Sequence, residues 1–148
     1  MATRGFEFAY MLNGANAGPV IRDWPVAATI GTAGHALTVD SSGYGTAVGT
    51  ATTEVLGILM ETISGTATAA DKYKVAIVTR DQVWRCSMDA TSCTAVVGYN
   101  KMGSFASASA IDADGWVDGS MILVDTDTDE DGYVLGYVVF ADTTFGNT

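Results

Sequence analysis

The stretch YKVAIVTRDQVWRCSM, residues 73–88, decides the fold class of this chain. Side chains suited to a strand interior recur at every second position in both of its halves: Tyr73, Val75 and Ile77, then Trp84, Cys86 and Met88. A period of two is typical of a β-strand that buries one face. The stretch therefore predicts two strands, and it places Trp84 in the core.

Short β-prone runs continue on both sides of this stretch. They are 19–30, 36–40, 54–63, 94–99, 120–126 and 133–141. Breaks rich in Gly and Thr separate them at about the 8–12-residue spacing typical of sandwiches and barrels, and no segment shows sustained helical periodicity. We predict an all-β fold, a small β-barrel or β-sandwich, as one domain over residues 19–148. An added subdomain at 90–148 is an alternative, because these residues exceed what a minimal domain needs.

Two of the late runs are apolar on both faces. They are MILV at 121–124 and YVLGYVVF at 133–140. An antiparallel strand normally leaves one face polar, so these strands are expected to be central in a closed barrel or to pack against another subunit.

The composition excludes several classes of function. The 148 residues carry a net charge of −10 with only seven basic residues, which disfavours binding to nucleic acid or to anionic membranes. A single histidine (His35) and no catalytic motif indicate a protein that is not an enzyme and needs no cofactor. The N-terminus lacks a secretory pattern and no apolar run is long enough for a membrane span, so we expect synthesis in a cytoplasm.

The N-terminal residues 1–18 differ from the rest. Phe6, Phe8 and Tyr10 alternate before NGANAG (13–18) interrupts any regular element. This pattern predicts either an edge strand or an extended N-terminal arm that orders on a partner, and we assign the arm to 1–18. Trp and Arg dominate binding hot spots. The predicted partner contacts are therefore Arg4, Phe6, Phe8, Tyr10, Arg22 and Trp24.

Two further clusters contain side chains that can bind metals. In DTDTDEDG (125–132), Asp127, Asp129 and Asp131 match the opening of a calcium loop, but Val138 stands where the loop needs its bidentate Glu. We interpret the cluster as an acidic turn, and a cation site is the alternative. The six-residue interval between Cys86 and Cys93 fits no zinc motif. The two are packed free thiols, or a disulfide if they lie across a hairpin.

Four consecutive segments carry a family resemblance: PVIRDWPVAATIG (19–31), AGHALTVDSSGYGTAV (33–48), TEVLGILMETISG (53–65) and KYKVAIVTRDQVWRC (72–86). This layout resembles the capsid decoration, or cement, proteins of tailed bacteriophages. The resemblance covers about half of the chain, is one of pattern and leaves 90–148 unplaced.

The resemblance implies a structural virion protein that is made in the host cytoplasm and lies on the capsid exterior. Its partners would be the major capsid protein and itself, as a trimer or alternatively a dimer. Other candidates are another virion subunit, such as a tail-tube, fibre or shell protein, or a calcium- or carbohydrate-binding β-sandwich.

Overall fold

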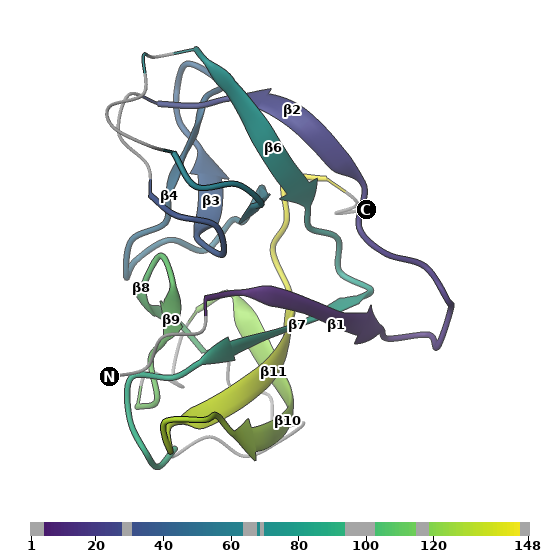
Figure 1. The fold of residues 1–148 in the computed structure, drawn as a ribbon, viewed down its shortest axis with the longest axis vertical. Helices are drawn as coiled ribbons and strands as arrows, with labels where there is room; N and C mark the ends of the chain where they lie inside the picture. Colours follow the sequence, from purple (N-terminus) through teal and green to yellow (C-terminus); the bar gives the residue numbers. More distant parts are fainter. Residues whose placement is uncertain are drawn as a thin grey trace.

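The computed structural model describes residues 5–27, 31–63, 68, 70–93, 103–114 and 119–145. The fold within these ranges is all-β, as predicted, with eleven strands in three antiparallel sheets and no helix. The two larger sheets occupy opposite halves of the molecule in Figure 1, as in a small sandwich, and neither closes into a barrel. No helix long and apolar enough to cross a membrane occurs in the described part of the chain.

The strand order in each sheet is simple. The four-stranded sheet is β1 (Glu7–Met11), β7 (Gln82–Ser87), β11 (Val134–Phe140) and β10 (Met121–Thr128). The five-stranded sheet is β2 (Ile21–Pro25), β6 (Lys72–Ile77), β5 (Gly57–Leu59), β3 (Ala36–Val39) and β4 (Gly45–Ala47). The two-stranded sheet is β8 (Phe105–Ser107) with β9 (Ala110–Ile111).

The decisive stretch 73–88 carries the chain from one large sheet to the other, because β6 and β7 lie in different sheets. The side chain of Gln82 stabilises the connection between β6 and β7 through three hydrogen bonds. Its buried amide accepts hydrogen bonds from the Thr79 backbone and the Trp84 indole, both 3.1 Å, and donates to the Ile77 carbonyl at 3.2 Å. The predicted burial of Trp84 is confirmed, with none of its surface exposed.

The five-stranded sheet is buried on both faces near its centre. Along the apolar run 54–63, Val55 and Ile58 belong to one core cluster, while Leu56 and Leu59 belong to another. The first cluster holds residues of both large sheets, and the second is formed by the five-stranded sheet and its flanking residues alone. A strand that faces two cores needs apolar side chains on both sides, which explains the nearly continuous apolar run.

Three phenylalanine rings join the four-stranded and two-stranded sheets. Phe6, immediately before β1, lies 5.7 Å from the Phe105 ring and 5.6 Å from the Phe140 ring, which lie 6.2 Å apart. The Phe6 amide also donates to the Gly34 carbonyl at 2.9 Å. A Cβ on Gly5 would meet that carbonyl at 3.0 Å, so this close approach of two backbones favours glycine.

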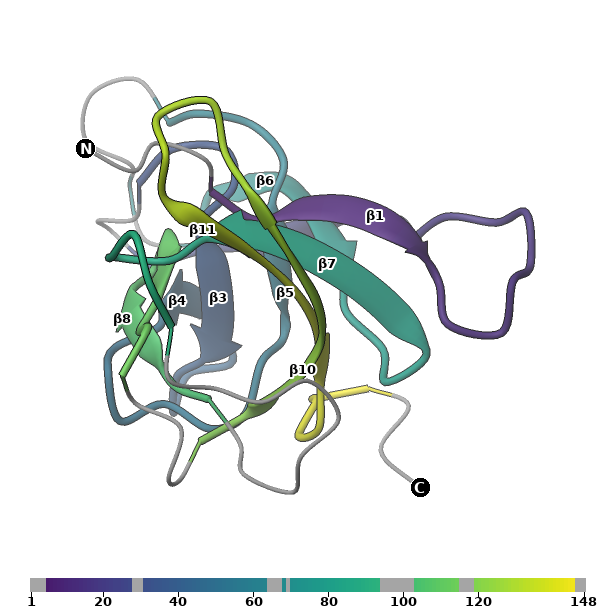
Figure 2. The same ribbon diagram turned by 90° about the horizontal axis from the view of Figure 1, so that it is seen from below.

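The N-terminal segment differs from the predicted arm. Residues 7–11 form edge strand β1, paired with β7, and Phe6 is 3% exposed. The described part of 1–18 thus follows the edge-strand alternative, because its aromatic rings find apolar partners within the chain. Only the β1–β2 connection, residues 12–20, projects from the body in Figure 2.

The C-terminal third shares this core. Phe105, Ile111, Met121 and Phe140 belong to the same buried cluster as Ala36 of β3, and β11 pairs directly with β7. The described residues of 90–148 are therefore continuous with the main core. Both faces of β11 are largely buried by the chain itself, so its apolar outer residues require no second subunit.

Replacing Phe6 by Ala is expected to lower the free energy of unfolding by about 3–5 kcal/mol, because it opens a cavity where the sheets meet. Tyr10→Ala, also on β1 but exposed, is the control and should cost less than about 1.5 kcal/mol. Urea unfolding measures both. Equal, small effects would show that the N-terminus is not part of the core.

His35 predicts a pH dependence. Partial burial lowers its pKa below the ordinary 6.5, so the unfolded chain binds a proton more readily than the folded one. Its contribution to stability is complete above pH 6.5 and declines as the pH falls below that value. His35→Gln should therefore lose less stability than the parent between pH about 7 and about 5.5, measured by urea midpoints. Parallel curves would contradict this assignment.

Candidate interaction surface at the β2 edge

β2 is an edge strand that pairs on one side only, with β6. The Ile77 amide donates to the Val20 carbonyl and the Val26 amide to the Asp71 carbonyl, both at 2.9 Å. Hydrogen-bonded pairs alternate along an antiparallel ladder, so the backbone groups of Ile21 and Asp23 point away from β6. The chain's only two prolines, Pro19 and Pro25, occupy the adjacent outward positions and have no N–H. The open edge thus offers two donors.

A groove of about 480 Å³ lies beside this edge. It is lined by Val20, Arg22, Asp23, Trp24, Ile77 and Phe145. The Trp24 indole donates to the Gly43 carbonyl at 3.2 Å, and its ring meets Phe145 edge-on at 5.7 Å. Phe145 reaches this position because the Thr144 amide donates to the Val55 carbonyl at 3.0 Å.

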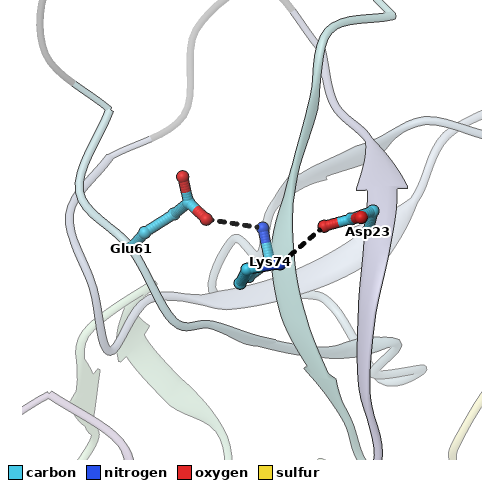
Figure 3. A network of polar contacts seen from close by, with 3 residues as sticks. All are labelled: Asp23, Glu61 and Lys74. Carbon is cyan, nitrogen blue, oxygen red and sulfur yellow. Dashed lines mark hydrogen bonds and ion pairs between the residues drawn. The ribbon is translucent and has the colours of Figure 1, made fainter.

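The two charged side chains of β2, Arg22 and Asp23, differ in whether they form an ion pair. Asp23 accepts a hydrogen bond from the Lys74 ammonium at 3.1 Å, and Glu61 accepts the Lys74 backbone amide at 3.0 Å (Figure 3). Arg22, exposed on the neighbouring position, forms no ion pair with any described residue. The surface therefore combines an open strand edge, an apolar groove and an unpaired guanidinium.

The six predicted contact residues have different locations. Arg22 and Trp24 lie together in the groove. Tyr10 is 44% exposed and stacks on Tyr137, while Phe8 is half-buried against Trp84. Phe6 is corrected to a core residue, because its ring packs against two other phenylalanines. Arg4 lies outside the described residues.

Sequence reasoning missed several members of this surface. Val20 and Phe145 are exposed apolar residues that line the groove with Trp24. Ile21 is exposed on the same strand, and Leu12 lies at the other end of the β1–β2 connection. Phe145 lies against Trp24, near the end of β2. No local signal marks Phe145, since its position depends on pairing with residue 55, far away in sequence.

The acidic turn at 129–133 serves the hairpin between β10 and β11. The Asp129 carboxylate accepts hydrogen bonds from the Ser87 hydroxyl at 2.6 Å and from the amides of Asp131 and Tyr133, both at 2.9 Å. These bonds occupy the oxygens that a calcium ion would need. Within the described ranges, no three His, Cys, Asp or Glu side chains are placed to hold a metal.

The same turn occurs twice. Asp40-x-x-Gly43-Tyr44 repeats the pattern of Asp129: the Asp40 carboxylate accepts the amides of Ser42 and Tyr44, both at 2.9 Å. Gly43 and Gly132 have φ values of 84° and 87°, in the left-handed region that favours glycine. The pattern Asp-x-x-Gly-Tyr is thus a turn motif that this chain uses in two hairpins.

Cys86 and Cys93 form no disulfide. Cys86 is buried and donates to the Ser109 carbonyl at 3.3 Å, and its burial raises the pKa of the thiol well above the usual value. A thiol that stays protonated is a poor nucleophile.

Comparison of the chain with protein-family models, with curated proteins and with solved structures gave no match.

As the acceptor of three hydrogen bonds in the turn, Asp129 is expected to stabilise the fold. Asp129→Ala should destabilise the protein by about 1–3 kcal/mol, because the Ser87 hydroxyl and two amides lose their acceptor. Asp127→Ala, at an exposed position of β10, is the control and should stay within about 0.5 kcal/mol. Thermal unfolding with calcium and then with EDTA should give the same midpoint. If calcium raised the unfolding midpoint and Asp129→Ala abolished that rise, the result would support a cation site instead of a structural turn.

Proposed function

We propose that this chain is a structural virion protein that binds the outer surface of a phage capsid and stabilises contacts between major capsid subunits. It has no catalytic role and uses no cofactor. The observation that carries the proposal is the β2 edge, where Arg22, Trp24 and an open backbone share one surface. The resemblance of residues 19–86 to decoration proteins supports the same function.

The other sheet edges favour β2 as the contact. β1 contains a bulge between Phe8 and Tyr10, and the distal half of β10 is exposed and carries Asp125 and Asp127. The first residue of β4 is covered, because the Ala27 amide donates to the Gly45 carbonyl at 2.9 Å. Bulges, charges and coverage all discourage strand pairing.

A small closed oligomer fits this role. The net charge of −10 limits open-ended self-association, and a trimer, or alternatively a dimer, presents several β2 edges to a repeating lattice. Weak contacts then combine, because each docked edge raises the effective concentration of the next.

Co-sedimentation tests the proposal. The purified chain is mixed with expanded shells of the major capsid protein from the same genome, and bound protein is quantified in the pellet. We expect saturable binding and a higher disruption temperature of the shells. The chain alone is the control and should stay in the supernatant as a small oligomer. Tubes or rings formed by the chain alone, or no binding to shells, would reject the decoration function.

A further inference from the structure

We propose that the β2 edge binds an extended segment of another protein, in which a carboxylate is flanked two residues away on each side by apolar side chains. The inference deepens the proposed function and rests on it only for the identity of the protein that carries the segment. Strand addition to an open edge supplies the backbone bonds, and the side chains supply the selectivity.

The backbone sets the length and register of the segment. Ile21 and Asp23 each present an outward N–H and C=O, while Pro19 and Pro25 end the row of donors on both sides. A partner strand therefore forms hydrogen-bonded pairs at these two positions. The residue between them lies opposite Arg22 in a non-hydrogen-bonded pair, where side chains approach most closely.

The side chains on this face define the sequence pattern. Val20, Arg22 and Trp24 alternate along β2 and line the same groove, with Phe145 beside Trp24. A carboxylate opposite Arg22 gains a charge-assisted hydrogen bond with a guanidinium that forms no ion pair with any residue the structure describes. Apolar residues two positions away on either side would contact Val20 and the Trp24–Phe145 pair. The pattern is apolar–x–acid–x–apolar.

A second copy of this chain fits the edge poorly. A two-fold pairing that uses both donors places Ile21 opposite Asp23, and it puts Arg22 directly against Arg22 of the other copy. Like charges directly opposite each other destabilise a strand pair, and two chains of charge −10 repel. The charge complementarity of Arg22 therefore favours a foreign acidic segment.

The test uses two capped peptides that are palindromic, so strand direction does not matter: acetyl-TVTETVT-amide and acetyl-TVTKTVT-amide. Each is titrated into the 15N-labelled full chain, and amide shifts are followed by NMR. The acidic peptide should shift the amides of residues 20–24 and bind about tenfold more tightly than the basic one. Arg22→Glu should reverse this preference.

A backbone variant isolates strand pairing. Ile21→Pro removes an outward donor that β6 does not use, so the fold should survive while both peptides bind about tenfold more weakly. Ile21→Thr keeps the donor and is the matched control, with near-parental binding expected.

Three results would overturn the inference. The first is the absence of amide shifts at residues 20–24 at millimolar peptide, and the second is equal affinity for both peptides. The third is a shift of the Ile21 and Asp23 amides that follows protein concentration without peptide, which would assign the edge to a second copy. Peptide binding without shell binding would support the inference and reject the proposed function. Shell binding without peptide binding would do the reverse.

Discussion

The contact among Phe6, Phe105 and Phe140 is the constraint on which the rest of the structure depends. These rings come from the residue before β1, from β8 and from the end of β11, and they meet within 5.6–6.2 Å. The large apolar area of each ring makes their burial a strong tie between the four-stranded and two-stranded sheets, and the Phe6 amide bonds to Gly34, just before β3 of the third. With Phe6 held before β1, residues 12–20 connect β1 to β2, which is the edge strand of the five-stranded sheet.

This arrangement separates the stabilising aromatic residues from the accessible ones. Phe6 and Trp84 stabilise the core, whereas Trp24 and Phe145 meet at the surface beside an open strand. Asp23 is balanced by Lys74, so the local charge that remains for a partner is that of Arg22. On a chain of net charge −10, one unpaired guanidinium in an apolar groove provides selectivity more than affinity.

Local patterns predicted most of the strands, but β4, β8 and β9 lie in no predicted run, and the predicted run 94–99 lies outside the described residues. The alternation in 73–88 indicated two strands and a buried Trp84, and both are present. The same pattern could not show that the strands belong to different sheets, because that depends on the Gln82 bonds at the crossing. Phe6 has the same local sequence in an arm as in a core, and only Phe105 and Phe140 decide between them. Arg22 and Trp24 were predicted as contacts from residue type, and they line one groove with Phe145, which was not predicted.

The central claim is that the N-terminal residues belong to the core while the β2 edge stays open for a partner. Residue-resolved amide hydrogen exchange of the free protein tests it most directly. The amide of Phe6, bonded to Gly34, should be protected like those of β7, whereas the outward amides of Ile21 and Asp23 should exchange rapidly. Rapid exchange at Phe6, or protection at Ile21 and Asp23 in the free protein, would contradict the account.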